Sequence, residues 1–434
     1  MTLSITTHVI TKEVRQKQSL IRKDKGVPQF AHNNVPYLFC ATSLKRLVLF
    51  ITLFVIATVG YTQEKESKVA FRGYVKNMTS VMQLNDSTMW YENLIHNRLN
   101  FTWYATDNFT VYLEARNRIL MGDFVKELHP LYGEVVDGNN DYFNLSTNVV
   151  DNKSLLINTM VDRLHVQWTK GDWEVKIGRQ RVNWGINLAW NPNDIFNAYS
   201  FFDFDYEERR GVDAMRIIYY SGVASSWEIA GKLARNKEDW VGGGIRRINK
   251  WNYDFQFVGG IAQGDFMLGM GWAGNIKLAG FKGEVTYLKP IFDTPTNLAY
   301  KQLLIGAVSF DYSFKNSLYL NGSVLYNSKN PIESAIGLGM TTTNANFTMR
   351  DLSTYRWSSF VQSAYQFTPL FFGSISVMAF PGTDAIFLNP SLSFSLTQNI
   401  DVGLFGQLFF DNDPLTGNYT SKNPSGFLRL KWSF

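Results

Sequence analysis

Histidine is the side chain that most often moves protons in enzymes. Three histidines follow residue 62 of the chain: His96, His129 and His165. General-base catalysis needs a nucleophile or an activated water within hydrogen-bond reach of such a base. No serine or aspartate pairs locally with His165, which shares one side of its segment with Arg163. The sequence therefore predicts a structural polar role for His165 and no enzymatic activity.

Metal and cofactor chemistry also lacks a sequence pattern. No cluster of His, Asp and Glu has the spacing of metal ligands. The only cysteine is Cys40, so the chain has no disulfide of its own. Gly242-Gly243-Gly244 lies inside an alternating segment, where it marks a bend rather than a phosphate-binding loop, because such a loop must open a helix. We predict no metal and no cofactor.

Basic side chains are the residues whose placement does indicate chemistry. They occupy the more polar side of segments in which apolar and polar residues alternate. The predicted basic wall consists of Arg72, Lys76, Arg98, Arg116, Arg118, Arg163, Arg216, Arg429 and Lys431, with Glu114 as its main acidic exception. Walls of Arg and Lys favour anions in water-filled pores. The alternative is that these cations pair with loop carboxylates and plug the interior.

A second charged group lies in a predicted loop, Trp184 to Val212. It consists of Asp203, Asp205, Glu207, Glu208, Arg209 and Arg210. Folded inward, these charges would oppose the basic wall and narrow a pore. The alternative is a solvated loop, because charge clusters commonly lie in solvent.

The segment before this cluster carries a resemblance to a known family. Gly178 to Gly185 reads GRQRVNWG, Asn191 to Asn197 reads NPNDIFN, and 201–210 reads FFDFDYEERR. This stretch resembles the "GRQ…WG…P.D..N" pattern of porin-superfamily proteins of the alginate-export and DUF1302-like kind. The resemblance implies an outer-membrane channel or exporter, and it does not imply alginate as the substrate.

One feature departs from a plain strand in this stretch. Alternation from Trp173 and Ile177 would place Arg179 and Arg181 on the apolar side. A bulge at Gly178, or emergence of the chain above the hydrocarbon, would resolve this conflict.

Alternation with a period of two recurs along the chain and predicts the elements that position these residues. In the final segment, Gly426 to Phe434, apolar residues alternate with Arg429, Lys431 and Ser433. The predicted strands are Val69–Gln83, Met89–Thr106, Phe109–Met121, Thr159–Lys170, Asp172–Asn183, Asp213–Tyr220, Ser226–Ala234, Asp239–Ile248, Tyr253–Ala262, Asp265–Ile276, Gly280–Leu288, Lys301–Tyr312, Ser317–Asn327, Thr354–Phe367, Phe371–Phe380, Ala385–Leu396, Ile400–Asp411 and Gly426–Phe434. An apolar side toward lipid and a polar side toward water would explain the pattern, with residues such as Trp103, Leu164, Ile177, Trp227 and Ile229 facing outward.

The connections between these strands fall into two classes. Every second connection is short. The long connections all fall in the other set, and they are Gly122–Asn158, Trp184–Val212, Lys289–Tyr300, Ser328–Ser353 and Asn412–Ser425. Short turns at one rim, long loops at the other and an even number of strands are typical of bacterial outer-membrane barrels. A two-sheet sandwich has no reason to sort its loops in this way.

The beginning of the chain is typical of a secretory leader. Lys45 and Arg46 precede an uncharged apolar run from Leu47 to Val59, which is short for a membrane-spanning helix. We assign residues 1–62 to a leader and signal peptide, with 1–44 a candidate for a start codon placed too early. Residues 1–62 hold eight basic and two acidic side chains, so residues 63–434 carry a net charge of −1 rather than +5. The basic isoelectric point of the whole chain thus gives no indication of nucleic-acid binding.

Together these patterns predict an all-β fold, a single transmembrane antiparallel up-and-down β-barrel over residues 63–434. We expect about 18 strands, with 16 as the alternative. The predicted function is a porin-like channel of the bacterial outer membrane for diffusion or export of small hydrophilic solutes, with modest anion preference. A non-conducting structural or assembly-partner barrel is the alternative. The expected partners are membrane lipid and small solutes, anionic ones included, and the formation of homo-oligomers is left open.

The leader assignment makes a direct prediction. Amino-terminal sequencing of the exported protein should begin near Gln63, because cleavage follows the small residues after the apolar run. A mature chain that retains Cys40 would contradict the assignment.

Overall fold

The computed structural model describes residues 67–85, 87–138, 141–198, 209–292, 302–328, 348–353, 355–412 and 417–434. The predicted leader, residues 1–62, lies outside these ranges. So do four members of the predicted constriction: Asp203, Asp205, Glu207 and Glu208.

The described residues form nineteen strands, two short α-helices and two 3₁₀ turns. The strands are β1 (Val69–Asn85), β2 (Thr88–Thr106), β3 (Phe109–Gly122), β4 (Ser146–Asp151), β5 (Leu156–Lys170), β6 (Trp173–Gln180), β7 (Val212–Gly222), β8 (Ser225–Lys232), β9 (Val241–Lys250), β10 (Tyr253–Ala262), β11 (Asp265–Ile276), β12 (Ala279–Pro290), β13 (Leu303–Ser313), β14 (Leu318–Asn327), β15 (Trp357–Thr368), β16 (Phe371–Ala379), β17 (Ile386–Thr397), β18 (Ile400–Asn412) and β19 (Tyr419–Ser433). The helices are α3 (Asp123–Glu127) and α4 (Leu131–Asp137), and the 3₁₀ turns are Lys237–Asp239 and Met349–Asp351.

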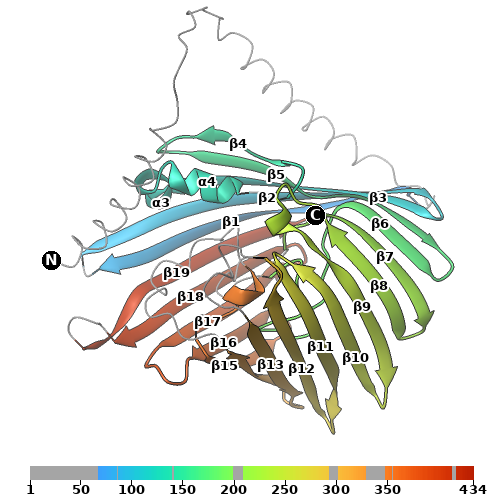
Figure 1. Cartoon of the computed structure of the whole chain (residues 1–434). Coiled ribbons are helices and arrows are strands. Elements are labelled where there is room, and N and C mark those ends of the chain that lie inside the picture. Colours follow the sequence, from blue (N-terminus) through green and yellow to red (C-terminus); the bar gives the residue numbers. More distant parts are fainter. Residues whose placement is uncertain are drawn as a thin grey trace, which may run out of the picture. The chain divides into compact units, whose positions relative to one another are not determined.

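Eighteen of these strands close into a ring. Each pairs antiparallel with its neighbours in the chain, and β19 returns to pair with β1. Figure 1 shows β19 beside β1, with the other strands following in chain order. The pairing matches Val75 with Trp432, and Gly73 exchanges two backbone hydrogen bonds of 2.9 Å with Phe434. Closure leaves no free edge among these eighteen strands, which a sheet in lipid requires because hydrocarbon cannot satisfy backbone amides.

The sequence prediction of eighteen strands is therefore confirmed, and the alternative of sixteen is wrong. The structure adds three elements inside the predicted loop Gly122–Asn158, namely α3, α4 and β4. β4 pairs only with β5 and stands outside the ring. The last predicted loop is shorter than expected, because β19 begins at Tyr419. No helix within the described ranges is long and apolar enough to cross a bilayer.

The two rims differ as the sequence predicted. Eight connections at one rim are tight turns, for example Asp107-Asn108 between β2 and β3 and Gln398-Asn399 between β17 and β18. The long connections, including those after β3, β6 and β14, join strand ends at the opposite rim. We call these the short-turn rim and the long-loop rim.

The strands present two chemically different faces. Large apolar side chains at outward positions are exposed, as the sequence predicted for Trp103, Leu164, Ile177, Trp227 and Ile229, each between 45% and 66% exposed. Inward positions alternate with them and include the charged residues of the predicted wall. Such exposure of large apolar side chains is a liability in water and is the normal condition of a lipid-facing surface.

A substitution at mid-strand tests whether this surface faces hydrocarbon. Ile229 lies in the middle of β8 and is 66% exposed. Ile229→Arg should destabilise the barrel by about 2–4 kcal/mol in lipid vesicles, because a cation is costly at the bilayer midplane. The measurement is the free energy of unfolding from urea titration. Val223→Arg, in a short turn and fully exposed, is the matched control and should change little; equal effects of the two variants would refute a lipid-facing belt.

Candidate functional site in the barrel interior

Strand register brings the predicted basic wall together from five strands. Lys76 on β1 lies opposite Lys431 on β19 and opposite His96 on β2. His96 in turn lies opposite Arg118 on β3. A second row places Arg98 opposite Arg116. Residues that are far apart in sequence thus form one continuous inward surface across the β19–β1 seam, because the ring is closed.

A β-bulge on β5 adds an acid to this surface. Glu114 on β3 pairs with Arg163 and the next residue, Ala115, pairs with Val161, so Asp162 has no partner across the ladder. A bulge of this kind re-aims side chains. Asp162 and Arg163 are both buried, at 1% and 8% exposure, although they are consecutive in a strand.

Asp162 and Glu114 neutralise part of the wall. Arg98 Nη1 lies 2.6 Å from Asp162 Oδ2, and Arg98 Nη2 lies 2.5 Å from Glu114 Oε2. Arg116 Nη2 is 3.3 Å from the other oxygen of Asp162. Two guanidinium groups therefore share one fully buried carboxylate, and the partners come from the strands of the wall rather than from the loops.

Exposure divides the wall into two parts. Lys76 and Arg98 have no exposed side-chain surface, and Arg116 is 2% exposed. Arg72 is exposed toward the short-turn rim, and Arg429 and Lys431 are half-buried. The Arg429 guanidinium lies 4.7 Å from the Phe405 ring centre, and Lys431 Nζ lies 4.5 Å from that of Tyr74. Arg118 and Arg216 are also half-buried, so five of the nine predicted residues retain solvent-exposed surface.

The part of the sequence motif that follows β6, as far as residue 198, folds back into the barrel. We call residues 181–198, which follow β6, the inner segment. Val182, Trp184, Trp190 and Ile195 of this segment are at most 3% exposed, and they join a buried apolar cluster with inward residues of β7–β18. The motif is thus a packing element inside the barrel.

The conflict of parity at the start of the motif is resolved at Gly178, whose φ is +119°. This backbone conformation favours glycine. Beyond it the strict alternation ends, because Arg179 and Gln180 are both buried, at 3% and 1% exposure. Arg179 makes two hydrogen bonds to Asp213, of 2.8 and 2.9 Å. Its charge therefore does not face lipid, whereas Arg181 is exposed.

Glu284 on β12 holds the inner segment in place. Its side chain is fully buried, and its two oxygens accept three backbone hydrogen bonds, from the N–H groups of Ile186, Asn187 and Asn193. The bond from Asn187 is 3.0 Å long and that from Asn193 is 2.8 Å long. Hydrogen bonds to an ionised group are worth about 1.5–3 kcal/mol each. One carboxylate thus satisfies loop amides that would otherwise be buried without partners.

Asn193 fixes the inner segment against β12 and the neighbouring strand β11. Thr286 Oγ1 donates to Asn193 Oδ1 over 2.7 Å, and Asn193 Nδ2 donates to the carbonyl oxygen of Met270 over 3.1 Å. A Cβ atom on Gly269 would lie 2.2 Å from Asn193 Oδ1, so glycine is required for this approach.

Glu228 on β8 supplies a second anchor. Trp184 Nε1 donates to Glu228 Oε1 over 2.7 Å. Arg216 makes two hydrogen bonds to the same carboxylate, of 2.6 and 3.0 Å, and Arg247 makes one of 2.6 Å. Arg216 is therefore placed apart from the rest of the predicted wall, in a cluster that supports the inner segment.

The two described members of the predicted constriction lie near the inner segment and the long-loop rim. Arg209 Nη1 lies 3.6 Å from Asp194 Oδ2, and Arg210 donates to the carbonyl oxygen of Gly138 over 2.5 Å. Burial raises the pKa of Asp194 to about 6, although Arg209 and the N–H of Trp184 favour its charged form. Whether the whole cluster narrows the pore depends on residues outside the described ranges.

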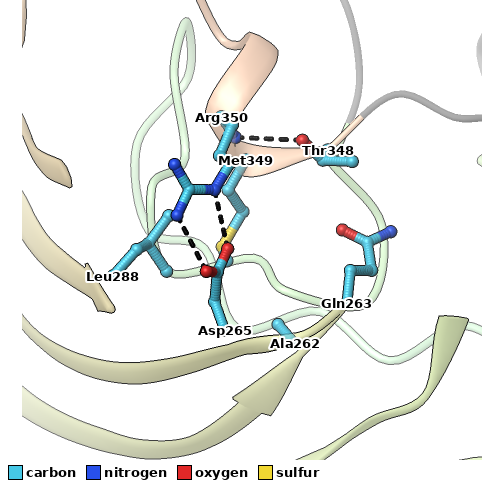
Figure 2. Close-up of a pocket in the computed structure, with 7 residues that line it drawn as sticks. All are labelled: Ala262, Gln263, Asp265, Leu288, Thr348, Met349 and Arg350. Carbon is cyan, nitrogen blue, oxygen red and sulfur yellow. Dashed lines mark hydrogen bonds and ion pairs between the residues drawn. The ribbon is translucent and has the colours of Figure 1, made fainter. Parts of the chain in front are cut away.

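A second segment, residues 348–353, is held against the strands of the barrel at the long-loop rim. Arg350 makes two hydrogen bonds to Asp265 on β11, of 2.7 and 2.8 Å, as Figure 2 shows. Thr348 caps the short turn by accepting from the N–H of Arg350. The cavity beside this ion pair has a volume of about 10 Å³, room for about one water molecule. The pair is thus a structural clamp and offers no space for a solute.

The acidic anchors were the part of the interior that the sequence analysis missed. Glu284 and Glu228 occupy inward positions of alternating strands, and that position was the available signal. Their partners, however, come from a loop whose path the sequence does not specify. His165, which the sequence assigned to structure, is stacked on Tyr112 at 4.7 Å, and its Nδ1 lies 3.2 Å from the carbonyl oxygen of Arg179. Within the described ranges no group of His, Cys, Asp and Glu could hold a metal ion.

Solved structures with a similar fold exist. OccAB4 of Acinetobacter baumannii aligns with a TM-score of 0.53 and 9% identity, over 86% of this chain and 100% of that chain. OccAB2 of the same organism aligns with a TM-score of 0.53 and 7% identity, over 84% and 98%. The outer membrane protein OpdK of Pseudomonas aeruginosa aligns with a TM-score of 0.52 and 11% identity, over 84% and 98%.

The chain has the fold of outer-membrane porins. No protein-family model matches the sequence, and no curated protein matches it. At identities of 7–11% the likeness concerns the fold alone. The alginate-export and DUF1302-like subtype stays a prediction of the sequence motif.

The anchoring role of Glu284 can be tested directly. Glu284→Gln removes the charge that three loop amides share, so amide hydrogen exchange at Ile186, Asn187 and Asn193 should accelerate about tenfold or more, the equivalent of one charge-assisted hydrogen bond. Thr286→Val on the same strand removes a single bond to Asn193 and is the control, with a smaller effect expected. Unchanged protection of these amides in Glu284→Gln would show that apolar packing alone holds the segment.

Proposed function

We propose that the protein is a channel of the bacterial outer membrane for passive diffusion or export of small hydrophilic solutes, with modest anion preference. A closed ring with an apolar exterior and a charged interior is suited to a bilayer and to water-soluble cargo. The similarity to porin structures supports the same placement.

The observation that carries this proposal is the division of the interior into two unlike sides. The basic wall lies on β19, β1, β2, β3 and β5. The inner segment is anchored to side chains of β8, β10 and β12 and to the backbone of β11 and β13. In a ring of eighteen strands β11 stands opposite β1, so a passage would run between a cationic side and a side on which carboxylates such as Glu228, Glu284 and Asp265 are buried or paired with cations. A solute with a negative charge gains attraction from one side without repulsion from the other.

The exposed part of the wall sets the strength of this preference. Arg72, Arg429 and Lys431 retain solvent-exposed surface, whereas Arg98 and Arg116 are buried against acidic partners. Partial neutralisation predicts a modest preference rather than strict exclusion of cations. A structure of the similar protein OpdK was determined with vanillate, which is a carboxylate, and this supports small organic anions as candidate solutes.

A non-conducting barrel is the second candidate. The burial of Lys76, Arg98 and Arg116 favours it, because fully buried cations contribute to stability rather than to transport. The apolar cluster around the inner segment also fills part of the interior. This candidate predicts no conductance and stable association with other outer-membrane proteins.

Bilayer recordings decide between the two. Under a salt gradient, the reversal potential of the wild-type protein should indicate anion selectivity. The double variant Arg429→Gln with Lys431→Gln should shift the permeability ratio of anion to cation toward one, because it removes two exposed wall cations. Lys250→Gln removes a cation from the outer face at the short-turn rim and should leave the ratio unchanged. Cation selectivity in the wild type, or an absence of channels, would contradict the proposed function.

A further inference from the structure

The described part of the outer face carries a cation, Arg246, at an unusual depth. Arg246 on β9 faces outward, because it lies opposite Trp227 on β8 and Phe257 on β10, which are 56% and 46% exposed. Other lysines at outward positions, Lys170, Lys250 and Lys289, stand at or next to a strand end. Arg246 is four residues from the end of β9, which places it roughly 10 Å inside the short-turn rim for a strand tilted by about 40°.

The Arg246 side chain bends toward that rim. Its guanidinium carbon lies 4.5 Å from the ring centre of Trp227, and its Nη1 donates to Ser221 Oγ over 2.7 Å. Ser221 is the penultimate residue of β7, beside the turn to β8. The charge is therefore carried from the apolar belt to the level where lipid headgroups begin, as long cationic side chains do at membrane interfaces.

The surroundings of the guanidinium are aromatic. Trp227 lies opposite Tyr219 on β7, and Tyr219 lies opposite Trp173 on β6, with ring centres 4.8 Å apart. Aromatic side chains of this kind prefer the boundary between hydrocarbon and headgroups. No carboxylate forms an ion pair with Arg246 within the described ranges. The Ser221 hydroxyl accepts from one N–H of the guanidinium group. A guanidinium group has five N–H donors in a planar fork, so donors remain for an anion.

We propose that Arg246, Ser221 and Trp227 form a binding site for the phosphodiester of a glycerophospholipid in the leaflet at the short-turn rim. The guanidinium would donate in bidentate fashion to the phosphate, and the acyl chains would lie along the apolar surface that includes Ile229 and Phe257. The phosphate accounts for a cation in a belt where an unpaired charge is costly. The bilayer itself provides the occupant, because the outward face of β7–β10 is the surface that contacts lipid.

Native mass spectrometry of the detergent-solubilised protein with added phosphatidylglycerol tests the site. Arg246→Gln should weaken the tightest lipid-binding event by about tenfold or more, because it removes both charge and fork. Arg246→Lys keeps the charge and loses the fork, so an intermediate loss is expected. Lys250→Gln, four residues along the same strand and also on the outer face, should leave this event within about twofold of the wild type, because a single surface charge contributes little.

Four results would overturn the proposal. Equal lipid binding by the wild type and Arg246→Gln would show that Arg246 forms no lipid-binding site. An equal loss of lipid binding in Lys250→Gln would show that lipid binding depends on general surface charge. Competition by inorganic phosphate at millimolar concentration would indicate a site for free anions rather than lipid. Dissociation of an oligomer by Arg246→Gln, measured by light scattering with lipid binding unchanged, would assign the face to a contact between copies of the chain. Ion selectivity should be unaffected in every variant, which separates this test from that of the channel.

Discussion

Closure of the hydrogen-bonded ring is the constraint on which the rest of this structure depends. Backbone amides have no partner in hydrocarbon, so a sheet that crosses a bilayer must pair its last strand with its first. The pairing of β19 with β1 does this, down to the two hydrogen bonds between Phe434 and Gly73. It also joins Lys76 to Lys431 in one row, so the same closure that removes the sheet edge assembles the basic wall.

The interior is stabilised by buried carboxylates in three different settings. Asp162 links two arginines of the wall, Glu228 links Arg216 and Arg247 to the inner segment, and Glu284 binds loop backbone. A buried charge is costly unless it is paired or hydrogen-bonded, and removing one partner leaves the other uncompensated. These carboxylates therefore specify one arrangement of the inner segment and the barrel strands rather than simply adding stability.

The proposed functions follow from where charge is left exposed after this pairing. The basic wall retains half-exposed cations such as Arg429 and Lys431, and the described outer face retains Arg246 in an aromatic belt. In the functions that we propose, the first set would act on solutes inside the barrel, and Arg246 would act on the surrounding lipid. Both are outcomes of the same alternation, because a shift of one residue in a strand exchanges the two faces.

The sequence by itself determined the strands, the two faces and the sorting of the loops, because alternation with a period of two and the spacing of turn residues are local signals. Strand limits such as Tyr253–Ala262 and Asp265–Ile276 follow directly from it. Only the tertiary structure decided which acid pairs with which base. The bulge on β5 turns Asp162 toward Arg98, which lies 64 positions earlier in the sequence. The path of the inner segment brings Asn193 to Glu284, which lies 91 positions later. The first contact exists once β2, β3 and β5 are paired in register, and the second exists once β12 and the inner segment meet inside the ring.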